Sequence, residues 1–224
     1  MTATLICYVI VYLGSLVAYF FSETSGNFAR RCVNKIIMAG MFLAIGFGGL
    51  IENGMIPTAL GITLAIGLIF AAIGDAALLW SFTLGGVSFG IGNITLFIAY
   101  LQYLSFMGVS FSQYWWFLII YVIFCATWLI LMKTGWIDFD KYGIKMVMYL
   151  FSVMLHGTLS IAGCFCLQDP RSLLMFIGSI FFMISDWFIS LHKFKYKESK
   201  LVHRFNSGTY FFGMLLIALG FQLF

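Results

Sequence analysis

The sequence predicts an all-α membrane protein, a polytopic bundle of about eight transmembrane helices. Of its 224 residues, 62% are hydrophobic and only 9% are charged, which is too little polar surface for a soluble domain. Apolar runs of roughly 19 to 24 residues recur along the chain, long enough to cross a hydrocarbon core about 30 Å thick. No linker or low-complexity stretch divides it. We therefore predict a single transmembrane domain over residues 1–224.

Each apolar run is assigned to a helix, because backbone polar groups inside lipid must form hydrogen bonds within their own segment. The predicted helices lie near residues 3–21, 34–51, 58–81, 86–107, 113–132, 143–166, 171–191 and 206–224. The longest connections are the first and the seventh. Both are rich in basic residues, which gives a test of the helix count.

Basic residues gather in or beside the first, fifth and seventh connections. They are Arg30, Arg31, Lys35, Lys133, Lys141, Lys145, Lys193, Lys195, Lys197, Lys200 and Arg204, whereas Arg171 alone lies beside an even-numbered connection. The odd-numbered loops share one face only if every helix between them spans. The positive-inside rule then places the odd-numbered loops in the cytoplasm and both termini on the opposite side. We read the formal net charge of +4 as this topology signal and predict no nucleic-acid partner.

A short internal similarity connects the third and seventh predicted helices. Ile69-Phe-Ala-Ala-Ile-Gly-Asp75 matches Ile180-Phe-Phe-Met-Ile-Ser-Asp186 at four of seven positions, 111 residues apart. One reading is a parallel repeat of four helices each, related by an axis along the membrane normal. The other is chance similarity between two apolar segments, and the sequence leaves both open.

Two glycines lie four residues apart in the fourth predicted helix, at Gly86 and Gly90. This spacing suits either a dimer contact or close helix packing inside the bundle. Packing is the preferred interpretation, because small residues at this spacing are common in membrane bundles.

Two carboxyl side chains lie within the predicted spans, Asp75 and Asp186, while the other six acidic residues fall in loops or at interfaces. A charged group inside a membrane costs several kcal/mol and usually marks a functional site. The alternative is a pair of hydrogen-bonded carboxyls that only hold helices together, but apolar side chains do that as well. We therefore predict that Asp75 and Asp186 form the working site.

Other polar side chains are expected at the same height in the cytoplasmic half of the membrane. Lys35 opens the second helix, Asn93 lies in the fourth, Tyr149 in the sixth and Tyr210 in the eighth. His156 lies deeper and has no second ligand at helical spacing, so we predict a satisfied interior histidine and no metal site.

Several short motifs give the chain a family resemblance. They are Gly74-Asp75 with Leu78 and Leu79, Gly178-xxx-Phe182-xx-Ser185-Asp186 with Phe194, Tyr149 with Met154, Lys35, and Thr209-Tyr210-Phe211 with Leu215, Leu216 and Gly220. In this order they resemble the signatures of the YhhN-type lysoplasmalogenase family of integral membrane proteins. The chain differs from the family pattern at Ile36, Tyr100 and Met214.

The resemblance implies a hydrolase that cleaves the vinyl ether bond of lysoplasmalogens to a fatty aldehyde and a glycerophospho-alcohol. Asp75 and Asp186 are then the catalytic acid and base, with either assignment open. Lys35, with Tyr210, is expected to bind the lipid phosphate, and Tyr149 and Asn93 to orient water or glycerol oxygens. We predict no cofactor, with a lysophospholipid substrate and the lipid bilayer as partners, and leave the oligomeric state open.

Two other function classes fit the same residues. A proton-coupled transporter of small solutes or lipids would use both carboxyls as a proton relay. A non-catalytic membrane scaffold would use them only for packing. Release of aldehyde from a lysoplasmenyl lipid distinguishes the hydrolase from both.

Overall fold

The regular structure is entirely helical over the residues that the computed structural model describes, which are 3–24, 26–56, 58–197 and 199–222. The helices are α1 (Ala3–Thr24), α2 (Phe28–Glu52), α3 (Ala59–Ala77), α4 (Phe82–Phe106), α5 (Phe111–Tyr114), α6 (Phe117–Lys133), α7 (Gly143–Cys166), α8 (Pro170–Phe194) and α9 (Lys200–Gln222), with a 3₁₀ turn over Asp140–Tyr142. Of these, α1 to α4, α7 and α8 are long and apolar enough to cross a membrane. These six helices indicate a multi-pass membrane protein. Helix α6 is shorter and α9 is not among the six, so the count of eight spans stays a prediction.

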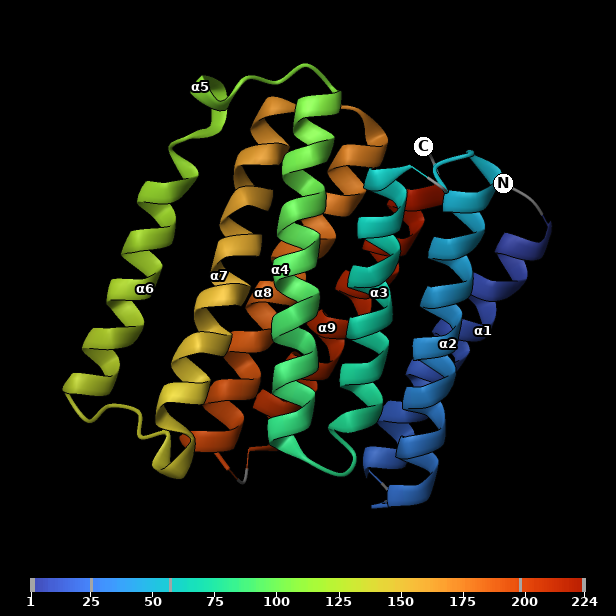
Figure 1. The fold of residues 1–224 in the computed structure, drawn as a ribbon. Helices are drawn as coiled ribbons and strands as arrows, with labels where there is room; N and C mark the ends of the chain where they lie inside the picture. The colour runs from blue at the N-terminus through green and yellow to red at the C-terminus, as the bar shows by residue number, and fades with distance from the viewer. Residues whose placement is uncertain (1–2, 25, 57, 198, 223–224) are drawn as a thin grey trace.

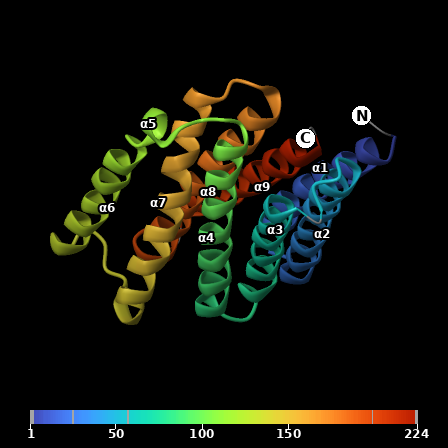
Figure 2. The same cartoon turned by 45° about the horizontal axis from the view of Figure 1, so that its top comes forward.

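Six helices close into a ring. The packed neighbours around it are α2 and α3, α3 and α4, α4 and α7, α7 and α8, α8 and α9, and α9 and α2. Helix α1 packs outside this ring on α2, and α6 packs outside it on α7 (Figure 1, Figure 2). In the order of the ring, α3 and α8 therefore stand opposite each other.

The neighbour pairs are the same in the two halves of the chain. Helices α1 to α4 pack in sequence, as do α6 to α9, and the contact of α2 with α9 has its counterpart in the contact of α7 with α4. This arrangement is what a parallel repeat of four helices would produce. The repeat itself stays a prediction.

Five helix ends extend three or more residues beyond the prediction, because the prediction followed the apolar runs. Helix α1 ends at Thr24, three residues beyond its predicted end, and α4 begins at Phe82, four residues before its predicted start. Helix α2 begins at Phe28, six residues before the predicted start, and α9 begins at Lys200, also six residues early. Helix α8 runs on to Phe194, three residues beyond its predicted end. Asn27 caps α2 by accepting a hydrogen bond from the backbone N–H of Arg30 at 3.0 Å, so the polar first turn is still helical.

Two other boundaries are moved by turns. The predicted helix over 58–81 ends at Ala77, because the chain turns and Ser81 caps α4 by accepting from the backbone N–H of Leu84 at 3.3 Å. The predicted helix over 113–132 is divided into the short α5 and α6, which begins at Phe117. The helix predicted over 143–166 is confirmed, and the last two residues of the one predicted over 206–224 lie outside the described residues.

The connections that follow α1, α3, α6 and α8 lie at one end of the bundle, which is the lower end in Figure 1. The start of α1 and the end of α9 lie at the opposite end. Eleven of the twelve Lys and Arg residues lie in the first two turns of α2, at the end of α6, in or just before the first turn of α7, in the connection between α8 and α9, or in the ends of α8 and α9 that flank it. We call this lower end the basic end. Which side of the membrane it faces stays a prediction.

Buried hydroxyl groups join α4 to α8 in the part of the ring away from the basic end. The hydroxyls of Tyr100 and Ser179 lie 2.8 Å apart, and those of Tyr103 and Ser172 lie 2.9 Å apart. All four side chains are at most 1% exposed. We call this region, built around these four residues, the closed half.

A glycine of the resemblance motifs brings α8 and α9 close together in the closed half. A Cβ added to Gly178 on α8 would lie 2.6 Å from the carbonyl oxygen of Gly213 on α9, so both helices need glycine there. Small residues of this kind let helix backbones approach inside a membrane.

Asp169 caps α8 at the entrance to the closed half. Its carboxyl accepts hydrogen bonds from the backbone N–H groups of Arg171 at 3.1 Å and Ser172 at 3.2 Å. Burial acts to raise the pKa of this carboxyl, but its hydrogen bonds with Ser172 and Arg171 outweigh that effect. The pKa of Asp169 is therefore below its usual value of 3.8.

The glycine pair of α4 does not pack as predicted. A Cβ added to Gly86 would meet no atom within 4 Å, and one on Gly90 would make only ordinary contacts with Ser152 and Tyr149 at 3.7 and 4.0 Å. Helix α4 instead packs on α3 through other glycines, since a Cβ on Gly85 would lie 2.5 Å from the Leu78 side chain. The prediction of close packing at Gly86 is wrong.

Candidate active site

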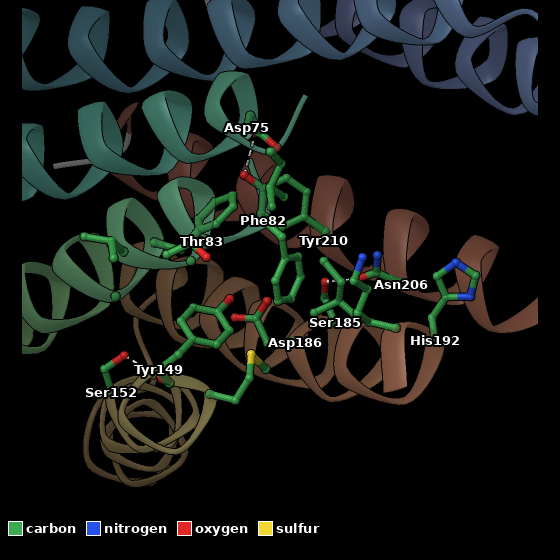
Figure 3. A pocket seen from close by; sticks show the side chains of 18 of the residues that line it. Asp75, Phe82, Thr83, Tyr149, Ser152, Ser185, Asp186, His192, Asn206 and Tyr210 are labelled. Atoms are coloured by element: carbon green, nitrogen blue, oxygen red, sulfur yellow. Dashed lines mark hydrogen bonds between the residues drawn. The ribbon is translucent and has the colours of Figure 1, made fainter. Parts of the chain in front are cut away.

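A cavity of about 590 Å³ occupies the basic-end half of the ring. Its walls are mainly apolar side chains from α4 and α7, and its polar side chains come chiefly from α2, α3, α7, α8 and α9. The polar and charged lining comprises Tyr19, Lys35, Asp75, Thr83, Tyr142, Lys145, Tyr149, Ser152, Ser185, Asp186, His192, Lys193, His203, Asn206, Ser207 and Tyr210. We call this region the open half. Figure 3 shows part of this lining, with both carboxyl groups among it.

Asp75 lies near the end of α3 and is 1% exposed. The Lys35 ammonium from α2 lies 3.1 Å from its Oδ1, and the Tyr210 hydroxyl from α9 donates to its Oδ2 at 2.6 Å. The preceding residue is Gly74, where an added Cβ would lie 2.9 Å from the Phe89 ring. The Gly-Asp motif thus has a physical reason, because glycine lets an aromatic ring of α4 pack beside the carboxyl.

Asp186 lies on α8, on the other side of the ring, and is 4% exposed. The Tyr149 hydroxyl from α7 lies close to it, and Figure 3 shows the two side chains next to each other. Within the described residues Asp186 forms no ion pair, and its Oδ2 is buried without a hydrogen-bond partner. A buried polar atom without a protein partner is uncommon, and this one belongs to a residue that lines the cavity.

The two carboxyl groups interact electrostatically. The charge of Asp75 acts on Asp186, and the hydroxyls of Tyr149 and Tyr210 each lie within range of both acids. The surroundings differ, however, because Asp75 has a cation and a hydroxyl donor while Asp186 has a hydroxyl alone. The site therefore contains two neighbouring acids in unequal environments, which is the arrangement that lets one ionise and the other keep its proton.

Three aromatic rings close the inner end of the cavity. Phe89, Phe182 and Tyr210 pack edge to face in a mutual cluster, with ring centroids 5.4 to 5.9 Å apart. Phe182 stands four residues before Asp186, so one helical turn places the ring directly beyond the carboxyl. This cluster separates the open half from the closed half.

Five of the six predicted site residues line the cavity, namely Lys35, Asp75, Tyr149, Asp186 and Tyr210. Asn93 is not among its lining residues. Its Nδ2 donates to the carbonyl oxygen of Phe89 at 2.9 Å, and its Oδ1 lies 3.1 Å from Nδ1 of His156. These contacts occupy the amide, and its predicted role in orienting water stays a prediction. His156 is buried as expected, although its Nε2 has no hydrogen-bond partner within the described residues.

Several polar residues of the cavity were missed in the sequence. Ser185 donates to Oδ1 of Asn206 at 2.9 Å, and the rings of His192 and His203 lie 5.0 Å apart near the basic end. Each of these histidines has a buried Nδ1 without a partner in the described part of the chain. His192 lies at the end of α8 and His203 at the start of α9, on the two sides of the connection that joins these helices. Their positions at adjoining helix ends were the sequence signal that could have revealed the pair.

Metal binding has no ready-made centre here. In residues 3–24, 26–56, 58–197 and 199–222, no group of three or more His, Cys, Asp or Glu side chains could hold an ion. The chemistry of the lining is that of carboxyls, phenols and cations.

The comparisons with known proteins give one match. The model of the YhhN family matches residues 30–221, which include both carboxyl groups and nearly all of the six helices of the ring. No curated protein and no solved structure matches the chain.

Proposed function

The chain belongs to the YhhN family, and from that premise we propose that it is a lysoplasmalogenase-like hydrolase. It would cleave the vinyl ether bond of lysoplasmalogens to a fatty aldehyde and a glycerophospho-alcohol, with Asp75 and Asp186 as its acid and base. The observation that carries the proposal is the pairing of two buried carboxyls of unequal environment on one apolar cavity. This pair supplies what the hydrolysis of a vinyl ether requires.

We assign the ionised form to Asp75 and the proton to Asp186. The Lys35 ammonium at 3.1 Å and the Tyr210 hydroxyl at 2.6 Å both stabilise a negative charge on Asp75. Asp186 has no cation beside it among the described residues, and the charge of Asp75 opposes a second ionisation. The sequence could not make this assignment, because it does not show which acid Lys35 meets.

The reaction follows from these roles. Asp186 transfers its proton to the vinyl carbon that does not bear oxygen, which leaves an oxocarbenium ion at the other carbon and a carboxylate on Asp186. Asp75 stabilises that cation by its negative charge. Water adds to the cationic carbon and gives a proton back to Asp186. Asp75 then takes the hemiacetal hydroxyl proton and delivers it to the leaving ether oxygen, which yields aldehyde and alcohol in a net addition of one water.

The phosphate is proposed to lie at the basic end of the cavity. Lys35 and Tyr210 were expected to bind it, but both are engaged with Asp75. Lys145, Lys193, His192 and His203 line the cavity on the same side. Cations and imidazole N–H groups are suitable partners for a phosphodiester, so this set takes the role proposed for Lys35.

A transporter fits the arrangement less well. Alternating access needs the cavity to open in turn toward the far end of the bundle. There the ring is filled by the closed half, where buried tyrosine and serine hydroxyls bind one another. The observed packing therefore favours hydrolysis at a cavity that is closed toward the far end of the bundle.

We also propose that the two halves of the chain are a parallel repeat. The support is the matching set of helix neighbours, together with Asp75 and Asp186 at corresponding positions of α3 and α8. In such a repeat the two acids began as equivalent groups, and Lys35 on α2 made them different.

The test is release of fatty aldehyde from a lysoplasmenyl lipid by the purified protein in detergent. We expect Asp75→Asn and Asp186→Asn each to lower the rate by about 10²- to 10⁴-fold, the usual contribution of general acid–base catalysis. Asparagine keeps the shape of the cavity, and a saturated alkyl lysophospholipid serves as the substrate control that yields no aldehyde. Near-normal release by either variant rejects the acid–base pair, and no release by the unaltered protein rejects the hydrolase.

A further inference from the structure

The cavity opens sideways between α4 and α7, in addition to its basic end. Val87, Ile91 and Ile94 on α4 line the cavity and are also 40 to 56% exposed. Met148 on α7 lines it too and is 70% exposed. A side chain can line the cavity and also be exposed only where the cavity reaches the outer surface of the bundle. We call this opening the α4–α7 portal, defined by these four residues.

The floor of the portal is made by the glycine pair of α4. Gly86 and Gly90 both line the cavity, and a Cβ on Gly86 would have no neighbour within 4 Å. Their neighbours Gly85 and Gly92 are different, because a Cβ there would meet Leu78 at 2.5 Å or the Gly67 carbonyl oxygen at 3.3 Å. One face of α4 thus uses glycine for packing against α3, and the adjacent face uses glycine to leave space.

The portal faces the hydrocarbon of the membrane. Val87 and Ile94 lie 5 and 12 residues after the first residue of α4, which is about 8 to 18 Å along a spanning helix. The exposed lining is aliphatic, and lipid chains are its natural surroundings. Asp75, Asp186 and Tyr149 stand farther inside the same cavity. An aliphatic chain lying in the portal would therefore hold the first atoms of its headgroup beside the acids.

We infer that the α4–α7 portal binds the aliphatic chain of a single-chain phospholipid, and that Gly86 and Gly90 determine how deeply this chain can lie in it. The inference rests on the proposed function for the choice of a lysophospholipid as ligand. Beyond the proposed function, the inference identifies where the lipid tail binds and names the two glycines that limit how deeply the tail lies. Leucine at position 86 would fill the space without strain on the helix.

The test measures binding without turnover. Hexadecyl and butyl lysophospholipids with a saturated ether bond are titrated against purified Gly86→Leu and unaltered protein. We expect Gly86→Leu to weaken binding of the hexadecyl lipid by about tenfold, the loss expected when two or so methylene groups are excluded from an apolar site. Binding of the butyl lipid should be unchanged, because its short chain does not fill the portal.

The matched control is Gly40→Leu on α2. Gly40 is exposed and also has no atom within 4 Å of an added Cβ, but it does not line the cavity. Equal binding of the hexadecyl lipid by Gly86→Leu and Gly40→Leu would overturn the inference. The inference would also be overturned if Gly86→Leu changed the oligomeric state while lipid binding was retained, because this face would then contact a second copy of the chain. Failed hydrolysis leaves the binding result intact, so the two proposals are tested separately.

Discussion

The four hydroxyls of the closed half and Asp186 of the open half differ in how their buried polar atoms are paired. In the closed half, Tyr100 and Tyr103 are matched by Ser179 and Ser172, and each hydroxyl has a partner. In the open half, Asp186 keeps an oxygen with no partner among the described residues, beside a cavity of about 590 Å³. The same six helices contribute to both. The difference is therefore one of side chains and not of architecture.

This contrast separates stability from function. Polar groups that satisfy one another fix the helices and need no ligand. Polar groups that are buried and left incomplete cost free energy, and a protein keeps them where a substrate completes them. Substitutions in the closed half should lower stability, while substitutions in the open half should lower activity.

After the two aspartate variants, the largest effect is expected for Lys35→Met in the open half. Loss of the ammonium removes the cation that keeps Asp75 ionised, and such a neighbour changes the balance between charged and neutral forms by about 10- to 1,000-fold. Aldehyde release should fall within that range. Lys35→Arg, which restores a cation, and Lys133→Met, at the end of α6 away from the cavity, should both remain active. Full activity in Lys35→Met would reverse the assignment of the two acids.

Two glycine substitutions compare the halves directly. Gly178→Ala would place a Cβ 2.6 Å from a backbone oxygen, and overpacking of this kind costs about 1–3 kcal/mol. Gly86→Ala adds the same methyl group to open space and should leave the free energy of unfolding undiminished. Thermal unfolding of both variants in one detergent measures the difference. Equal midpoints would mean that the two helix faces are packed alike.

Two tyrosines give a second comparison with a smaller effect on stability. Tyr103→Phe removes the hydrogen bond with Ser172 and should cost about 1 kcal/mol, with aldehyde release unchanged. Tyr210→Phe makes the same change beside Asp75 and should lower the rate about tenfold, as the loss of a hydrogen bond to a charged group would. The prediction fails if Tyr103→Phe lowers the rate as much as Tyr210→Phe.

The smallest effect is expected at Asp169, which caps α8. Its pKa is lowered in the folded protein, so its contribution to stability is present above the unfolded pKa of 3.8 and is lost as the pH falls through the folded value. The side chain is 25% exposed, and solvent screening therefore limits its contribution to stability to about 1 kcal/mol or less. Carboxyls of this kind titrate roughly between pH 6 and pH 3. Over this range the thermal unfolding midpoint of Asp169→Asn should therefore change less with pH than that of the unaltered protein. If the midpoints of the two proteins changed equally with pH, Asp169 would not be the source of this pH dependence.

The sequence predicted the helices because lipid requires long apolar runs, and it predicted Asp75 and Asp186 because a carboxyl stands out within such a run. It misplaced the starts of α2 and α9, since hydropathy does not register a polar helical turn. It predicted Asn93 at the level of the two acids but could not give the direction of its side chain, which meets His156, the residue that the sequence placed deeper.

That direction depends on which helices become neighbours. The open space at Gly86 and the pairing of His192 with His203 follow from the same cause. The open space and the histidine pair exist only when the ring is closed, and no local sequence pattern predicts which helices close it.

Closure of the ring also has a consequence for biogenesis. The contact between α9 and α2 joins the last described helix to one made much earlier. Lys35 can meet Asp75 as soon as α2 and α3 have left the translocon, whereas Tyr210 arrives only with α9. A nascent chain halted before α9 would expose Asp75 and Asp186 to lipid or to membrane chaperones. Insertion of α9 thus completes the chamber and shields its acids at the same moment.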